Sequence, residues 1–590
     1  MFRTMGLLLG IAASGQVLAG SSNSLMDIST DGKLLVCSNR DAGSITFVDL
    51  ELHKTLREVK VGRHPEGVTF LGASHDVAVA IYGEDRIDFY SADSGEKSGT
   101  ISVFDEPYAV VSSHDGSRIW ATLEFPGEVI EIDPVRHDII RKVQAGSYLR
   151  GLAATSDHKL LVTEYYTGVV KAVDLESFLV TSQWPGSEQD NLARQITTHP
   201  DWPKAYLPHQ RSLTTVAHGS GSIFPYLGIV NLDEAAETRR KRKQMDSFRG
   251  TYVVANPWEV AVSPDGERLY IVFSGTDDMF VCRLINDDYR EIEYEALLRT
   301  GSNPRAVRVS PDSKSFYVYN ALDFTIDVYS AATNERQDSI SVTSWNSTPE
   351  ILLGKKLFYT AHTPMTARRW ISCSSCHPDG DSDGRTWQQP EGLRSTQPLF
   401  GLKGTHPVHW SADRDEVQDF EHTIRSPLMG GRGLVRGTIN DALGEPNAGL
   451  SPELDALAAY SDSHEFEMSP YSRDGLSESA RRGQQVFLSA EVGCAKCHFG
   501  SYFTDRKMHD VGTGNDDESE KLGPDFDTPT LLGIYRSAPY LHHGRAETLK
   551  DLLTTANKDD QHGRTSQLGE SQIDDLVEFL KALPFEDPAN

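Results

Sequence analysis

The sequence predicts a multidomain β + α protein, in which an N-terminal seven-bladed β-propeller is followed by a mainly α-helical part. Two observations predict this order. Between about residues 25 and 342, a polar turn recurs every 41 to 64 residues between alternating, β-branched runs. After about Trp345 these repeats stop, and helical segments separated by Gly- and Pro-rich loops take their place.

The repeats of the first half have the period of propeller blades. Each polar turn is typical of a β-hairpin, and a further strand is expected after each hairpin. A unit of about 40 to 45 residues with three or four short strands matches one blade, so seven units close a ring. The turns lie around Asp31, Ser74, Asp115, Asp157, Asp201, Asp265 and Asp312. Two stacked β-sandwiches are the alternative, which the even period disfavours.

One gap in the repeat is longer than the others. It predicts an insertion from about residue 209 to 250, which contains the basic run from Arg239 to Lys243. In an acidic protein such a run could dock a partner or the second half of the chain, but a solvated loop is the favoured interpretation. The turn sequence around Asp265, Ser-Pro-Asp-Gly, resembles that of YVTN-type propellers.

Charge and composition exclude several classes of partner. The 590 residues include 57 Lys and Arg against 85 Asp and Glu, a formal charge of −28, and 38% are hydrophobic. A general affinity for nucleic acid or anionic membranes is not expected, because phosphate binding needs a basic face. No window after the N-terminus is long and apolar enough to span a bilayer. A small dipolar or cationic redox protein remains a possible partner.

The first 19 residues predict a signal peptide. Arg3 precedes an apolar run from Gly6 to Ala13, and small residues lead to a cleavage site after Ala19. A membrane anchor is disfavoured because the run is too short to span a bilayer. A lipoprotein is disfavoured because position 21 is Ser21 rather than cysteine. We therefore expect an exported, soluble, periplasmic protein.

Two copies of one motif carry the chemistry. Cys373 and Cys376 precede His377, and Cys494 and Cys497 precede His498 with the same spacing; this is the c-type haem attachment signature. On a helical turn such residues share a face, so both thiols can reach the haem vinyl groups while the imidazole reaches the iron. A zinc site and a redox disulfide are the alternatives. The motifs predict two covalently bound c-type haems.

Residues from about 349 to the C-terminus resemble the dihaem cytochrome c peroxidases and the enzyme that matures methylamine dehydrogenase. The resemblance lies in residues 353–358, 371–373, 409–414, 483–487, 528–531 and 538–544. It implies two cytochrome c-like lobes, predicted at residues 343–470 and 471–590, each with one haem.

The resemblance also implies roles for individual residues. His377 and His498 correspond to the proximal iron ligands, and Trp410 to a tryptophan that relays electrons between the haems. His542 corresponds to a histidine near the haem propionates. Ordinary packing is the alternative for both Trp410 and His542.

At the second haem, the sequence departs from the family. The family takes a methionine or tyrosine ligand from the position that is Ala556 here. The nearest strong ligand is His562, so bis-histidine ligation by His498 and His562 is expected, with Met508 and His509 in reserve.

At the first haem, the stretch from Leu428 to Gly431 lacks the acid/base glutamate of the peroxidases. Heterolysis of peroxide needs a proton donor, for which His406, His409, His422 and Glu421 are candidates. The predicted catalytic residues are Trp410, His409, His406 and Arg414. Calcium is a further candidate ion: Ser537 and Pro539 match the backbone positions that hold it in the peroxidases, but the asparagine expected near Ser395 is missing.

These expectations combine into a function. We expect an exported dihaem c-type oxidoreductase that passes electrons between an external carrier or substrate and a peroxide- or oxygen-reactive haem. A maturation-type enzyme that oxidises a residue of another protein is one alternative. A non-enzymatic electron-transfer or scaffold protein with two six-coordinate haems is another. The expected partner is a monohaem cytochrome c, a cupredoxin or a protein substrate.

Overall fold

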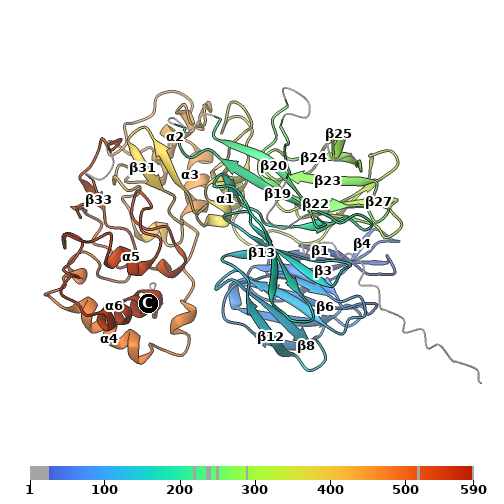
Figure 1. The fold of residues 1–590 in the computed structure, drawn as a ribbon. Coiled ribbons are helices and arrows are strands. Elements are labelled where there is room, and N and C mark those ends of the chain that lie inside the picture. The colour runs from blue at the N-terminus through green and yellow to red at the C-terminus, as the bar shows by residue number, and fades with distance from the viewer. Residues whose placement is uncertain are drawn as a thin grey trace, which may run out of the picture.

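The computed structural model describes residues 25–216, 221–233, 241–246, 252–286, 290–514 and 518–587. The predicted signal peptide, residues 1–19, lies outside these ranges. Two parts lie side by side in Figure 1: a ring of β-sheets, coloured blue to green, and a mainly helical part, coloured yellow to red.

The first four blades of the ring are antiparallel four-stranded sheets whose strands follow in chain order. Blade one comprises β1 (Met26–Ile28), β2 (Leu34–Asn39), β3 (Ser44–Asp49) and β4 (Lys54–Lys60). Blade two comprises β5 (Pro65–Phe70), β6 (Asp76–Ile81), β7 (Arg86–Ser91) and β8 (Lys97–Ser102). Blade three comprises β9 (Pro107–Ser112), β10 (Ile119–Leu123), β11 (Glu128–Asp133) and β12 (Asp138–Gln144). Blade four comprises β13 (Leu149–Ala154), β14 (Lys159–Glu164), β15 (Val170–Asp174) and β16 (Val180–Trp184).

Three further blades complete the ring, which confirms the predicted seven-bladed propeller. Blade five comprises β17 (Asp190–Asn191), β18 (Thr197–Thr198), β19 (Lys204–Ser212), β20 (Ile223–Asn231) and β21 (Lys241–Gln244). Blade six comprises β22 (Pro257–Val262), β23 (Arg268–Phe273), β24 (Asp278–Leu284) and β25 (Ile292–Arg299). Blade seven comprises β26 (Pro304–Val309), β27 (Ser315–Asn320), β28 (Thr325–Ser330) and β29 (Arg336–Ser341).

The polar turns close the first hairpin of the blades. In the turn of blade three, the Ser113 hydroxyl donates to Asp115 at 2.7 Å, and Asp115 also accepts from the Ser117 amide at 3.0 Å. These hydrogen bonds, with that of the Ser113 hydroxyl the largest, lower the pKa of Asp115 to about 2. The same Ser or Thr to Asp hydrogen bond recurs at Asp31, Asp157, Asp265 and Asp312.

Blade five differs from the expected insertion at residues 209–250. β20 and β21 lie inside this segment; β20 pairs with β19 and β21 pairs with β20, so much of the segment forms the blade itself. Lys241 and Arg242 of the basic run are ion-paired with Glu291 and Asp190 at 2.6 and 2.7 Å. Two long strands, each of nine residues, stretch the spacing of the turns without interrupting the sheet.

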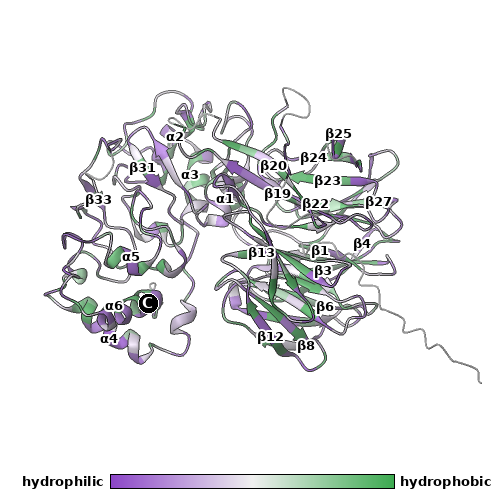
Figure 2. Cartoon of the chain, viewed as in Figure 1, coloured by the Kyte–Doolittle hydropathy of each residue, from purple (hydrophilic) through white to green (hydrophobic). Residues whose placement is uncertain are grey.

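The ring closes between the last blade and the first. Apolar side chains of both blades, such as Leu35 and Ile326, form one buried cluster. The Thr46 hydroxyl of blade one donates to the Val342 carbonyl, directly after blade seven, at 2.6 Å. Figure 2 shows hydrophobic residues along the propeller strands. Burial of this surface between blades holds the ring together.

The C-terminal part contains six α-helices and two small hairpins among its described residues. The helices are α1 (Pro349–Tyr359), α2 (Glu421–Arg425), α3 (Pro452–Ser461), α4 (Glu478–Leu488), α5 (Leu549–Leu553) and α6 (Glu570–Lys581). The hairpins pair β30 (Thr386–Gln389) with β31 (Gly392–Ser395), and β32 (Met508–Asp510) with β33 (Asp525–Asp527). The helices expected from the sequence at about residues 349–358, 450–460, 477–489, 548–555 and 571–582 correspond to α1, α3, α4, α5 and α6. No helix of the described ranges is long and apolar enough to cross a membrane.

Both halves of this part use the same helix crossing. α1 packs on α3, and α4 packs on α6. A Cβ atom on Gly354 of α1 would overlap the carbonyl oxygen of Ala456, and one on Gly483 of α4 would overlap that of Asp575. Each crossing therefore depends on a glycine that lets two backbones meet. The repeated crossing agrees with two similar lobes, while their predicted division after residue 470 remains a prediction.

The glycine crossings can be tested by single substitutions. We expect Gly354→Ala and Gly483→Ala each to lower the free energy of unfolding by about 1–3 kcal/mol, because the added methyl forces the helices apart. Gly569→Ala is the control, since its Cβ would meet only the Gln572 side chain at 3.8 Å. Urea denaturation measures the effect; equal stability of all three variants would contradict the proposed crossings.

Candidate haem sites

The two cysteine-histidine motifs adopt the same backbone turn. The 3-10 turns η2 (Cys373–Ser375) and η7 (Cys494–Lys496) each begin with the first cysteine. The His377 amide donates to the Cys373 carbonyl at 2.9 Å, and the His498 amide donates to the Cys494 carbonyl at 3.1 Å. Two thiols and one imidazole are thus held on a single turn in each lobe, as the spacing predicts.

The four motif thiols are free and partly buried. Burial raises the pKa of Cys373 to about 12 and that of Cys494 to about 11, and it also raises the pKa values of Cys376 and Cys497. A redox dithiol depends on a lowered pKa, and zinc binds the thiolate. Buried, paired thiols on a turn fit covalent attachment of a haem better than a redox dithiol, while their pKa does not exclude zinc, which itself deprotonates a bound thiol.

Both motif histidines are neutral imidazoles. Burial lowers the pKa of His377 to about 4 and also lowers that of His498. Nδ1 of His498 lies 3.0 Å from the Phe503 carbonyl, which can only accept, so Nδ1 carries the proton and Nε2 keeps its lone pair. A neutral imidazole oriented by a carbonyl is the usual state of a metal-binding histidine. His498 is oriented in this way, whereas Nδ1 of His377 is buried without a hydrogen-bond partner among the described residues. Two thiols and one imidazole on a single turn fit a haem at each motif.

His562 faces His498. The centres of their two rings lie 6.2 Å apart with the planes tilted by 45°. Two imidazoles on opposite sides of one metal ion have ring centres about 6 Å apart, because each metal–nitrogen bond is about 2 Å long. Burial and the neighbouring His498 lower the pKa of His562 to about 4, so its lone pair is also available. This separation fits the predicted bis-histidine ligation at the second haem.

Asn557 holds the loop that carries His562, and the sequence analysis missed it. Its carbonyl oxygen accepts from the His562 amide at 2.9 Å, and its amide group donates to the carbonyls of His562 and Gly563. The same amide group donates to the Thr565 hydroxyl at 2.8 Å. Such a contact has no signature in one sequence, because asparagine is common in loops.

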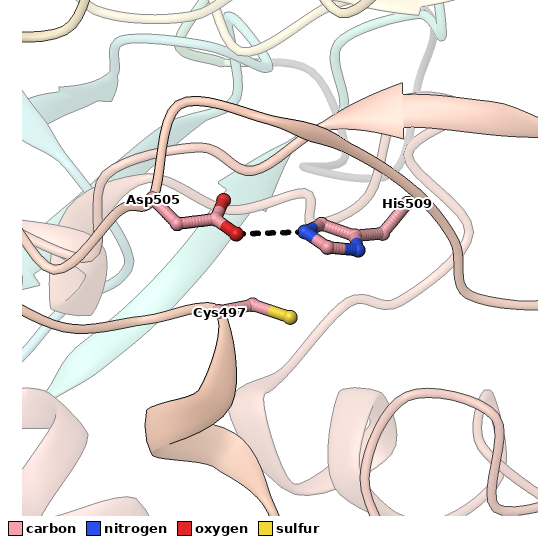
Figure 3. Close-up of side chains that lie close together, drawn as sticks. All are labelled: Cys497, Asp505 and His509. Atoms are coloured by element: carbon pink, nitrogen blue, oxygen red, sulfur yellow. Dashed lines mark hydrogen bonds and ion pairs between the residues drawn. The ribbon is translucent and has the colours of Figure 1, made fainter.

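The reserve candidate His509 lies on the other side of the same motif. Figure 3 shows His509 and Asp505 beside Cys497. Nε2 of His509 is 2.8 Å from the Asp505 carboxylate, and these two residues and Cys497 could together hold a metal ion. A metal ion bound by these three residues would consume a thiol of the haem motif, and the Asp505 carboxylate already bonds Nε2 of His509. Met508 is partly exposed.

The propeller supports the first motif. Asn256, just before β22, donates to the hydroxyls of Ser372 and Ser374 at 2.9 and 3.1 Å, and accepts from Ser375 at 2.7 Å. Arg305 of blade seven bonds Asp379, two residues after His377, at 3.0 Å. The position of the first motif is therefore set partly by the propeller.

The rings of Trp410 and His542 lie side by side. Their ring centres are 6.3 Å apart, and His542 stacks on Phe526 at 3.7 Å. The Trp410 indole donates to the Ser395 carbonyl at 2.9 Å, while its own carbonyl accepts from the Asp527 amide at 2.8 Å. Trp410 thus bridges segments of the predicted first and second lobes.

The acid/base candidates fall into two groups. Nδ1 of His409 bonds Asp413 at 2.8 Å, and Arg414 bonds the same carboxylate at 2.8 Å. His406 lies 3.4 Å from Asp462, whose hydrogen bond raises the pKa of His406. Glu421, in contrast, is buried and accepts from Arg425 and the Leu434 and Val435 amides, so its carboxylate is structural.

His464 is a second residue that the sequence analysis missed. It is close enough to His377 to help lower the pKa of that residue, and burial lowers its own pKa to about 4. Nδ1 of His464 lies 2.9 Å from the Ser461 carbonyl, which leaves Nε2 as an acceptor. Its position, just after α3 and far from any motif, gave no signal in the sequence.

Calcium at the backbone positions matched to the peroxidases stays a prediction. The Ser395 carbonyl accepts from the Trp410 indole, and the Pro539 carbonyl accepts from the Ser395 hydroxyl at 3.4 Å. A calcium ion takes six to eight oxygen ligands, usually with carboxylates among them. Among the His, Cys, Asp and Glu side chains of the described residues, only Cys497, Asp505 and His509 cluster like a metal site.

Comparisons with known proteins find one matching family model and several relatives. The family model "Lactonase, 7-bladed beta-propeller" matches residues 194–350. The hydrazine synthase gamma subunit of Kuenenia stuttgartiensis is 32% identical over 36% of this chain and 72% of its own length. The methylamine utilization protein MauG of Methylorubrum extorquens is 27% identical over 41% and 80%. The cytochrome c551 peroxidase of Nitrosomonas europaea is 22% identical over 44% and 86%.

The contacts of Asn557 lead to a first prediction for these sites. We expect Asn557→Ala to lower the free energy of unfolding by about 1–3 kcal/mol, because it leaves buried backbone groups of the His562 loop unpaired. Hydrogen exchange should quicken at residues 557–565. Asn346→Ala, at an exposed asparagine with one contact, is the control. Unchanged exchange in the Asn557 variant would contradict the anchoring role.

Asp527 gives a pH-dependent prediction. Burial raises its pKa to about 7, and its buried Oδ1 has no hydrogen-bond partner in the described structure. The stabilisation by the bound proton is fully present below about 3.9, the pKa of Asp527 in the unfolded chain. It is lost as the pH rises through about 7, the pKa in the folded protein. Asp527→Asn removes this loss, so we expect its stability relative to the wild type to rise by roughly 2–4 kcal/mol between pH 4 and 8. Urea denaturation of both proteins at pH 4 and pH 8 measures this difference in the free energy of unfolding. A difference that does not change with pH would contradict the prediction.

Proposed function

Because the chain belongs to the dihaem family that includes MauG, the cytochrome c peroxidases and the hydrazine synthase gamma subunit, fused here to a seven-bladed β-propeller, we propose that it is an exported, periplasmic dihaem c-type oxidoreductase. Electrons pass between an external carrier or substrate at the second haem and peroxide or dioxygen at the first. When bound, the haems supply the iron that exchanges electrons and activates the oxidant.

One observation carries the proposal: two equivalent turns each present two neutral thiols and a neutral imidazole, and His562 faces one of those imidazoles at the separation that a shared iron requires. The two sites differ in their surroundings. At the first, the imidazoles of His409 and His464 both lie close enough to His377 to help lower its pKa. The second has a dedicated loop ligand.

The second site suits exchange with a small redox protein. Leu488, six residues before Cys494, is 62% exposed, and Phe499, directly after His498, is 52% exposed. Apolar side chains at a surface favour docking of a partner with a matching apolar patch. A monohaem cytochrome c or a cupredoxin is the partner we propose.

Trp410 couples the two sites in this proposal. Its indole donates to the Ser395 carbonyl of the predicted first lobe, and its ring lies beside His542 of the predicted second lobe. A fixed aromatic ring with a polar handle keeps one orientation, which suits electron relay between two centres. We propose that His542 orients the Trp410 region and lies near the haem propionates.

Proton delivery at the first site falls to His409, with His406 as the second candidate. Asp413 accepts from Nδ1 of His409, and this contact helps to lower the pKa of Asp413 to about 2, although burial opposes it. A carboxylate that stays ionised fixes the tautomer of its histidine, so Nε2 of His409 can accept and return a proton. Arg414 holds the same carboxylate in place.

His464 favours a second candidate function, electron transfer without catalysis. If Nε2 of His464 binds the first iron opposite His377, both haems are six-coordinate and no position is open to peroxide. The similarity to MauG supports the third candidate, oxidation of a residue on another protein.

Spectra of two variants test the ligand assignment. We expect His562→Ala to convert the second haem from low to high spin, because its loop ligand is removed, while His509→Ala, the matched control, keeps the wild-type EPR spectrum. An unchanged low-spin second haem in His562→Ala would remove His562 from this role. Reduction of peroxide by a reduced carrier protein would support the proposed enzymatic function. Two low-spin haems that react with neither peroxide nor cyanide would support electron transfer without catalysis.

A further inference from the structure

A small cavity lies on the axis of the propeller. It measures about 20 Å³ and is lined by the innermost strands of several blades or by the loops that lead to them. Its lining residues are Leu25, Glu66, Gly67, Tyr108, Arg194, Gln195, Trp258, Glu259 and Arg305. One water needs about 10–15 Å³ of such space, so the cavity holds one or two groups of that size.

Arg194 brings an unpaired charge to this cavity. Its side chain is 96% buried, because only 4% of the residue is exposed. Its Nε is buried without a hydrogen-bond partner, and within the described ranges the guanidinium forms neither a hydrogen bond nor an ion pair. The guanidinium lies over the Trp258 ring at 4.0 Å and 5.2 Å from the centre of the Tyr165 ring. These π faces compensate a buried cation only in part.

The carboxylates around the cavity are already matched with other cations. Glu66 bonds Arg40 at 2.6 Å, and Glu259 bonds Arg308 at 2.5 Å. The remaining lining cation, Arg305, bonds Asp379 at 3.0 Å. Arg194 also lowers the pKa of Asp379, but after Arg305 and Arg40 and from beyond ion-pair distance. The lining therefore carries one positive charge more than its close ion pairs account for.

We propose that this cavity binds one halide-sized inorganic anion, with the Arg194 guanidinium as its main ligand. A buried, unpaired charge is strongly unfavourable, and an anion of one atom fits the available space. A carboxylate-sized anion does not fit in about 20 Å³. Tyr108 lines the same cavity and its hydroxyl forms no hydrogen bond within the described structure, so it offers a neutral second donor.

The site connects to the first haem motif through one ion pair. Arg305 lines the cavity and bonds Asp379, which directly follows His377 and Pro378. Arg305 and Arg194 lie over the same Trp258 ring, at 4.2 and 4.0 Å. An anion in this cavity therefore stabilises Arg194 and Arg305, and Arg305 in turn holds Asp379 next to the first motif. This inference does not depend on the proposed redox function.

Bromide tests the site directly. Crystals of the full-length holoprotein soaked in sodium bromide should show an anomalous peak in the cavity beside Arg194. In solution, exchange of gluconate for bromide at constant ionic strength should raise the Tm by at least about 2 °C, since a ligand that binds only the folded state stabilises it. Sulfate, which is too large for the cavity, raises the Tm of folded proteins in general because it is excluded from their surface, so its effect should be the same in the wild type and in Arg194→Gln.

Two variants separate the site from general salt effects. Arg194→Gln should lose both the peak and the halide-dependent rise in Tm, whereas Arg136→Gln, at an arginine that is 65% exposed on blade three, should keep both. A cavity that holds only water in the bromide crystals, or a bromide-dependent change in Tm that is equal in the wild type and in Arg194→Gln, would overturn the proposal. The crystal measurement on the wild type decides the proposal by itself if Arg194→Gln fails to fold.

Discussion

Both haem sites depend on one hydrogen bond, which the backbone amide of each motif histidine donates to the carbonyl of the first cysteine of its motif. This hydrogen bond, made by His377 and again by His498, closes a turn that carries two thiols and an imidazole within five residues. Without it the thiols would not share a face with the imidazole, and neither attachment nor ligation would be possible from one turn. Its repetition in two lobes, each with a glycine helix crossing, makes the sites equivalent in backbone.

The propeller breaks this equivalence. Asn256 bonds three serines of the first motif, and Arg305 bonds Asp379 directly after it. Among the described contacts, the second motif has no such support, and exposed apolar residues flank it instead. A covered site and an accessible one are the arrangement expected if chemistry happens at the first and exchange with a partner at the second. The fused propeller is then part of the first site rather than a separate module.

The sequence predicted features that repeat or that lie close together along the chain. The polar turns indicated seven blades because they recur at the spacing of a blade, and five of them use the same local hydrogen bond. The haem motifs were recognised because five consecutive residues carry each of them. Blade five was misjudged in part, since β20 and β21 lie in a stretch whose length resembles an insertion. Asn256, His464 and Asn557 were missed because their roles come from contacts that only the folded chain creates.

The central claim, that two haems are covalently attached through the four motif cysteines, is tested most directly by the intact mass of the protein. The chain should be expressed in a host that matures c-type cytochromes and measured under denaturing conditions, which remove any haem that is not covalently bound. The account predicts the polypeptide mass plus two haem groups, and one haem fewer when either cysteine pair is replaced by alanine. The bare polypeptide mass, or a single haem in the wild-type protein, would contradict it.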